Sequence, residues 1–113
     1  MSAVQPVTVM ITVADKVQAG RFAELLVESR LAACVQILPP VMSLYRYEGK
    51  IERAEEVLIL VKTTAAMFEQ LEATVQTYHS YENPEIVATP ITQGSAAYIQ
   101  WLAENVGPET TGE

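Results

Sequence analysis

The stretch from Ala33 to Thr63 constrains this chain most, because it has the pattern of one very long β-hairpin. Within Val41–Tyr47, alternate side chains share a face, which is the period-two pattern of a strand. Glu48-Gly49 follows, and a glycine in the second loop position suits the positive φ of a tight two-residue turn. After a polar patch, Val57–Val61 is apolar at every position, as in a strand that is covered on both faces.

The length of the two arms predicts that the hairpin takes part in assembly. Each arm has about 12–15 residues and would extend roughly 40–50 Å, whereas a common strand has about 5–6 residues. A single domain of 113 residues cannot cover arms of that length, so the tip must protrude. An exposed apolar hairpin is an aggregation hazard unless a partner pairs with it. We therefore predict a subunit interface at Leu44, Tyr45, Tyr47 and Ile51.

Before the hairpin, the sequence predicts a buried strand and an amphipathic helix. Residues 7–13 are β-branched and apolar without Gly or Pro, which indicates a central strand. Asp15 is a suitable N-cap. Phe22, Leu25 and Leu26 then recur at helical spacing, so a helix of roughly 13–15 residues follows.

After the hairpin, a second helix, a short strand and a last helix are expected. Thr63 or Thr64 would cap the second helix, whose apolar positions are 67, 68, 71, 75 and 78. Residues 85–91 read as a short strand, which Pro90 limits to an edge or an end. Ser95 would cap a short helix, and the Gly-Pro pair at 107–108 would stop it.

This order predicts an α+β domain with the ferredoxin-like βαββαβ arrangement. It comprises a four-stranded antiparallel sheet with both helices on one face, a long protruding hairpin between the second and third strands, and an extra C-terminal helix. We expect a single domain over residues 7–106, with flexible termini at 1–6 and 107–113. The second sheet face also needs cover, and copies of the same chain in closed cyclic symmetry are the economical solution.

Composition narrows the classes of partner and compartment. Half of the residues are apolar and 19% are charged, as in an ordinary globular protein. A formal charge of −7 argues against binding to nucleic acid or to anionic membrane surfaces. The sequence has neither a transmembrane-length apolar run nor the pattern of a signal peptide. Its single cysteine suits a reducing compartment, so we expect a cytoplasmic protein.

Five motifs in order resemble the CutA family of divalent-cation tolerance proteins, over about Val7 to Leu102. They are L-V-E-S-R-L-A-A-C-V-Q-I at Leu26–Ile37, S-L-Y-R-Y-E-G-K-I at Ser43–Ile51, K-T at Lys62-Thr63, H-S-Y-E-N-P-E-I at His79–Ile86 and Y-I-Q-W-L at Tyr98–Leu102. The resemblance implies a ferredoxin-like fold and a compact homotrimer similar in architecture to the PII signalling proteins. In such a trimer the hairpins reach across subunit boundaries. It also implies a role in tolerance of copper and other divalent metals.

Cys34 and His79 are the candidate metal ligands, since they are the only soft or borderline ligands besides the methionines. With Glu82 or Glu85 they could hold a Cu or Zn ion. Two or three ligands from one chain make a weak site, which a trimer interface could complete. The alternative is structural: Cys34 as a small strand residue, and His79 as a helix-end residue that bonds local carbonyls.

A small-molecule pocket between subunits is the second candidate site. Lys62 precedes the predicted N-terminus of a helix, which suits an anion. The alternative is a Lys62 ion pair with Glu82 or Glu85 across a subunit boundary. The expected pocket residues are Tyr45, Lys62, His79, Tyr81, Glu82 and Trp101. The aromatic members could instead pack in an interface with satisfied polar groups.

The sequence offers little for catalysis. It has no G-x-S-x-G, Walker A or G-x-G-x-x-G motif. Glu55 and Glu56 are adjacent on a strand and point to opposite faces, so they cannot share a substrate. We therefore expect a non-enzymatic homotrimer of metal-ion tolerance that requires no cofactor and binds Cu(II) or another divalent cation weakly. The alternatives are a PII-like sensor that binds a metabolite at subunit clefts, and a pure scaffold.

Overall fold

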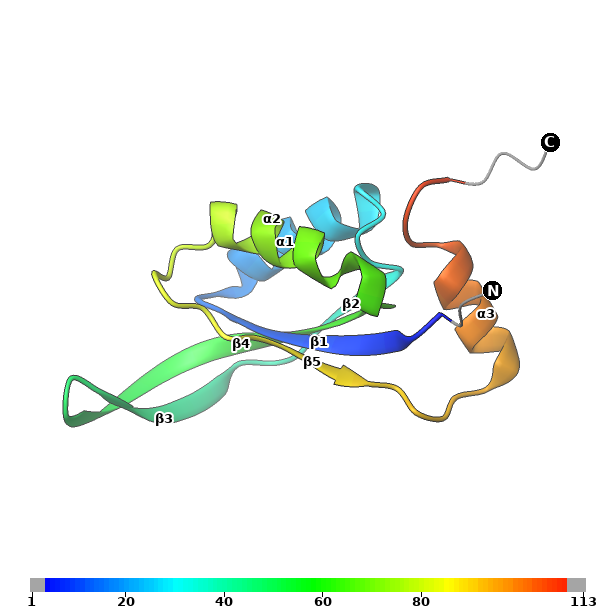
Figure 1. Cartoon of the computed structure of the whole chain (residues 1–113). Helices are drawn as coiled ribbons and strands as arrows, with labels where there is room; N and C mark the ends of the chain where they lie inside the picture. The colour runs from blue at the N-terminus through cyan, green and yellow to red at the C-terminus, as the bar shows by residue number, and fades with distance from the viewer. Residues whose placement is uncertain (1–3, 110–113) are drawn as a thin grey trace.

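The computed structural model describes residues 4–109, which form a mixed α+β domain (Figure 1). Its elements in chain order are β1 (Pro6–Val13), α1 (Lys16–Glu28), β2 (Cys34–Ile37), β3 (Val41–Tyr47), β4 (Lys50–Thr64), the 3₁₀ turn η1 (Ala65–Met67), α2 (Phe68–Tyr78), β5 (Ile86–Pro90) and α3 (Ala96–Glu104).

The strand order confirms the predicted ferredoxin-like sheet. The strands follow one another across the sheet as β2-β4-β1-β5, and every neighbouring pair is antiparallel. Figure 1 shows α1 and α2 together on one face of this sheet, while α3 lies beyond the end where β1 begins. Within residues 4–109, no helix covers the central strands on the opposite face (Figure 1).

The hairpin protrudes as expected. Glu48 and Gly49 have φ values of 50° and 80°, so both central turn residues adopt the positive φ that a type I′ turn requires. β4 runs for 15 residues, and its first half pairs only with β3 among the described strands. The molecule measures 55 × 26 × 23 Å, and the hairpin extends its long axis (Figure 1).

A bulge at Pro39-Pro40 divides the first arm into two strands, so the sheet has five strands and not the predicted four. Ile37 pairs with Ile59, whereas Val41 pairs with Glu56. Residues 38–40 of one arm therefore stand against only residues 57–58 of the other. Neither proline can donate a ladder hydrogen bond, and the extra residue shifts the register by one.

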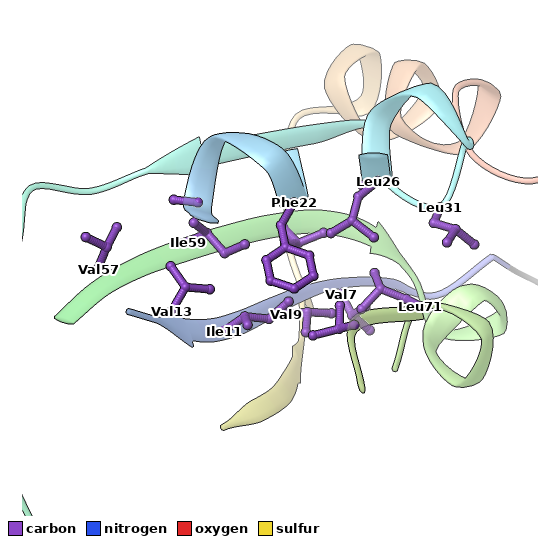
Figure 2. Packing of buried hydrophobic residues seen from close by; sticks show 14 residues of the cluster. Val7, Val9, Ile11, Val13, Phe22, Leu26, Leu31, Val57, Ile59 and Leu71 are labelled. Atoms are coloured by element: carbon purple, nitrogen blue, oxygen red, sulfur yellow. The ribbon is translucent and has the colours of Figure 1, made fainter. Parts of the chain in front are cut away.

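The core lies between the sheet and the two helices (Figure 2). Val9, Ile11, Ile59 and Val61 are fully buried on the helix-covered face of β1 and β4. From the helices, Phe22, Leu26 and Leu71 pack against them. Core residues alternate along β1 and β4 and account for half of the apolar positions in these strands. The residues between them therefore face away from the helices.

The helix starts agree only in part with the sequence prediction. Asp15 caps α1, since its Oδ1 accepts from the Gln18 N–H at 2.9 Å. Neither predicted threonine caps α2, because β4 continues through Thr64 and a 3₁₀ turn precedes the helix. The Thr63 hydroxyl instead donates to the Leu31 carbonyl at 2.7 Å inside the core. Ser95 occupies the N-cap position of α3 without a side-chain capping bond.

The termini predicted to be flexible, residues 1–6 and 107–113, fall partly outside the described residues. Of the described part, Pro6 begins β1, and the Gly107 N–H donates to the Arg30 carbonyl at 2.8 Å. Across residues 4–109, no helix combines the length and apolar character that crossing a membrane demands.

Candidate functional site

The sheet face that α1 and α2 leave uncovered is defined here as the open face. Its residues on β4 and β1 are those that alternate with the core residues. The residues of β2 and β5 that pair directly with them lie on the same face. Its members are Thr8, Met10, Thr12, Cys34, Gln36, Leu58, Leu60, Lys62, Val87 and Thr89. Met10 and Leu60 are directly opposite one another at its centre, and both are only partly buried. The open face is therefore apolar at its centre and polar toward both ends.

At one end, where the hairpin leaves the sheet, Tyr81 and Glu56 are joined. The Tyr81 hydroxyl donates to Glu56 Oε2 at 2.7 Å. Glu56 is only 9% exposed, although the β4 residues nearer the tip are largely exposed. A carboxylate held this far from water needs such a hydrogen bond, because desolvation of a charge is costly.

His79 anchors the loop that carries Tyr81. Its Nε2 lies 2.7 Å from the Thr12 carbonyl oxygen, and its Nδ1 accepts from the Tyr81 N–H at 2.9 Å. A carbonyl can only accept and an amide N–H can only donate, so the ring is neutral with its proton on Nε2. The ring also packs on Phe22 and Tyr81, with centroid separations of 5.6 and 4.7 Å. Both ring nitrogens are therefore engaged within the subunit.

Thr12 and Glu85 complete this group, which is called the root cluster: Thr12, Glu56, His79, Tyr81 and Glu85. The Thr12 hydroxyl donates to Glu85 Oε1 at 3.1 Å, and the Thr12 N–H donates to the Glu85 carbonyl at 3.4 Å. Burial and the Glu56 carboxylate together raise the pKa of the Tyr81 hydroxyl well above its ordinary value. Tyr81 therefore remains a neutral donor at physiological pH.

A second group lies at the other end of the open face and is called the edge cluster: Cys34, Gln36, Lys62, Tyr98 and Trp101. Cys34 pairs directly with Lys62, whose Nζ donates to Gln36 Oε1 at 2.7 Å. The Tyr98 and Trp101 rings contact one another in a tilted arrangement, with centroids 5.5 Å apart and an interplanar angle of 39°, and both are partly exposed. Burial, with a smaller contribution from the Cys34 thiol, raises the pKa of the Tyr98 hydroxyl. This end combines a cation, a thiol and two aromatic rings.

One subunit does not gather the predicted metal ligands. Lys62, beside Cys34, pairs with Thr8 of β1, whereas His79 bonds to Thr12, four residues further along that strand. Four residues of a strand span about 13 Å. Glu82 is exposed in the loop after His79. Among residues 4–109, no three His, Cys, Asp or Glu side chains are grouped so that they could hold a metal ion. A cation site shared between copies remains a prediction.

The predicted pocket residues likewise divide between the two ends. His79 and Tyr81 belong to the root cluster, and Tyr45 lies close enough to influence the Tyr81 hydroxyl electrostatically. Lys62 and Trp101 belong to the edge cluster. The predicted interface residues are all exposed in the single subunit, from 44% for Tyr45 to 60% for Ile51.

Sequence reasoning missed the root cluster as a unit. It placed Glu56 in a polar patch and considered it beside Glu55 as a carboxylate pair without a catalytic role, and it gave no role to Thr12 or, in the edge cluster, to Gln36. Only one signal was available in the sequence: Glu56 directly precedes the apolar run of β4, so it had to lie near the point where burial begins.

The fold and site define a class: a ferredoxin-like protein with an uncovered sheet face and a projecting hairpin. The family model of the CutA1 divalent ion tolerance proteins matches residues 7–105. The chain belongs to this family.

Its relatives come from bacteria, plants and animals. The divalent-cation tolerance protein CutA of Thermus thermophilus is 48% identical over 99 residues, which cover 88% of this chain and 96% of that protein. The human protein CutA is 38% identical over 94 residues, covering 83% of this chain and 52% of its own length. The chain thus spans about half the length of the plant and animal relatives that it matches.

Solved structures agree with the fold. The Thermus thermophilus divalent cation tolerance protein superposes with a TM-score of 0.89 at 46% identity, covering 90% of this chain and 99% of the other. The Oryza sativa CutA1 structure gives a TM-score of 0.90 at 35% identity, covering 92% and 95%.

Proposed function

We propose that this chain acts in divalent-cation tolerance as a non-enzymatic, cytoplasmic homotrimer of PII-like architecture. The observation that carries the assembly is the open face, whose central Met10, Leu58 and Leu60 are left without a covering helix. The exposed Leu44, Tyr47 and Ile51 of the hairpin add to this apolar surface. Surface of this kind marks an interaction site. The number of three subunits rests on the CutA resemblance, and a trimer satisfies the preference for closed cyclic symmetry.

The cation, Cu(II) or another divalent ion, would bind between copies. Cys34 of one subunit would supply a thiolate, and His79 and Glu82 of a second copy would supply nitrogen and oxygen ligands. The ligand chemistry supports this proposal. Because Cys34 and His79 lie apart within one subunit, only residues from two copies could bring them together. Because His79 Nδ1 accepts from the Tyr81 N–H, a metal must displace that bond. The expected affinity is therefore weak.

Sedimentation and metal titration test this proposal together. The wild-type chain should sediment as a trimer at micromolar concentration and bind Cu(II) with a defined stoichiometry. Cys34→Ser combined with His79→Ala should remove the Cu(II) binding, whereas Met42→Leu should leave both the binding and the trimer unchanged. A stable monomer would contradict the assembly. Equal Cu(II) binding by the wild type and the double variant would contradict the metal site.

Lys62 supports a second candidate function, a sensor that binds an anionic metabolite at the subunit cleft. Among the side chains of residues 4–109, its ammonium donates only to the neutral amide oxygen of Gln36. An anion bound there would gain a charge-assisted hydrogen bond. A metabolite that raises the Tm of the wild type, but not of Lys62→Ala, would support this function. A screen without any such shift would count against it.

A further inference from the structure

The root of the hairpin has the geometry of a hinge. Val57 is the last β4 residue that pairs with β1, and Ile59 is the last that pairs with β2. From Glu56 outward, β4 is bonded only to β3 within residues 4–109. The opposite arm at this point is the proline bulge of residues 38–40. A two-stranded ribbon attached through one continuous strand and one bulge has little backbone bonding to hold its direction.

Glu56 is the first residue beyond the last β1–β4 pair, and it is the residue that Tyr81 binds. Tyr81 lies in the loop that descends from α2 past the end of β1 to β5 (Figure 1). That loop is tied to Thr12 of β1 at two points, through the His79 ring and through Glu85. The hairpin is therefore connected to the central strand by side chains at the place where its backbone bonding ends.

We propose that Glu56, Tyr81 and His79 form a clasp that fixes the direction in which the hairpin leaves the sheet. His79 and Glu85 hold the loop on Thr12, the His79 Nδ1 orients the Tyr81 backbone, and the Tyr81 hydroxyl holds the Glu56 carboxylate. Glu56 is almost completely buried, which makes this hydrogen bond important, because its loss would leave the carboxylate without the Tyr81 hydroxyl as donor. The clasp belongs to one subunit and requires no cation.

The clasp would favour assembly because it preorganises the hairpin for contact with another copy. A hairpin that already points in its bound direction loses less conformational freedom when it contacts another copy. This consequence rests on the proposed trimer, whereas the clasp itself does not. The clasp and the trimer can therefore be tested separately. Hydrogen exchange and label distances report on the clasp, whereas sedimentation reports on the trimer.

Hydrogen exchange of the full chain tests the clasp. In Tyr81→Phe, the exchange rates of the amides of residues 41–58 should rise about tenfold more than those of α1, which follow only the change in global stability. Glu56→Gln retains an acceptor for the Tyr81 hydroxyl, so its exchange rates at 41–58 should lie between those of the wild type and of Tyr81→Phe. Tyr78→Phe is the matched control, because its ring is exposed at the end of α2. Wild-type exchange at 41–58 in Tyr81→Phe would overturn the clasp, and so would an equal rise in α1.

A distance measurement gives an independent readout. Spin labels at Glu52→Cys near the tip and Glu24→Cys on α1, in a Cys34→Ser background, report the angle between hairpin and domain. Labelled chains are diluted with unlabelled protein so that distances within one subunit dominate. The distance distribution should widen at least about twofold when Tyr81→Phe is added. An unchanged width would contradict the clasp, even if the trimer forms normally.

Discussion

Arg30 and Gly107 hold each other by reciprocal bonds: Arg30 Nε donates to the Gly107 carbonyl at 2.6 Å, and the Gly107 N–H donates to the Arg30 carbonyl at 2.8 Å. A third bond runs from Arg30 Nη2 to the Glu104 carbonyl at 2.8 Å. These bonds attach the end of α3 to the turn after α1. They also satisfy carbonyls that the end of a helix leaves without partners.

Replacing Arg30 should therefore destabilise the protein. Arg30→Ala removes the side-chain bonds, and we expect a loss of about 1–3 kcal/mol in the free energy of unfolding. Arg30 has φ 62°, so Arg30→Gly should be less damaging than Arg30→Ala by about 1 kcal/mol. Urea denaturation at matched protein concentration measures both, with the exposed Arg21→Ala as control. Equal stability of Arg30→Ala and Arg21→Ala would show that the bonds contribute nothing.

Gly20 offers a stabilising substitution. It lies inside α1, its φ is not in the left-handed region, and an added Cβ would meet no heavy atom within 4 Å. Gly20→Ala should therefore raise the free energy of unfolding by about 0.5–1 kcal/mol. Gly49→Ala is the contrasting variant, because its φ of 80° strains any side chain. A stabilising Gly49→Ala, or a destabilising Gly20→Ala, would contradict this assignment.

The hairpin, its turn and the helix faces could be predicted because they depend on local patterns. Period-two alternation and Gly49 at the turn were sufficient for the hairpin. Other features depend on distant partners. Thr63 has the sequence context of a helix cap, yet Leu31 provides a buried acceptor that keeps Thr63 in the strand. The register shift at Pro39-Pro40 depends on which residues of both arms pair, which one arm alone does not encode.

The candidate sites were less predictable for the same reason. The hydrogen-bond partner of the buried Glu56 is Tyr81, which is 25 positions away in the chain. The separation of Cys34 from His79 follows from strand register and could not be read from their motifs. Sequence indicated the residue types that carry chemistry, whereas their grouping into two ends of one face required the fold.

The raised pKa of Tyr81 predicts a specific response to alkaline pH. The native state holds the hydroxyl proton more tightly than the unfolded chain, whose tyrosines ionise near about pH 10. The contribution of Tyr81 to stability is thus fully present below about pH 10 and declines as the pH rises above it. Tyr81→Phe should be less stable than wild type by about 2 kcal/mol at pH 8, and this gap should narrow at pH 10.5. Urea denaturation at both pH values measures this difference in the free energy of unfolding, with Tyr78→Phe as control. A difference that is larger at pH 10.5 than at pH 8 would contradict the prediction.

Assembly should depend on the hairpin more than on the helices. Leu44 is 55% exposed on β3, and Tyr78 is 64% exposed at the end of α2. If other copies cover the hairpin, Leu44→Asp places a charge in an apolar contact and should weaken association about 10- to 100-fold. Tyr45→Ala should act in the same direction. Tyr78→Asp should leave association unchanged, because α2 lies on the face opposite the open one (Figure 1). Sedimentation velocity over a concentration series compares the three variants, and equal effects of Leu44→Asp and Tyr78→Asp would exclude the hairpin as the principal contact.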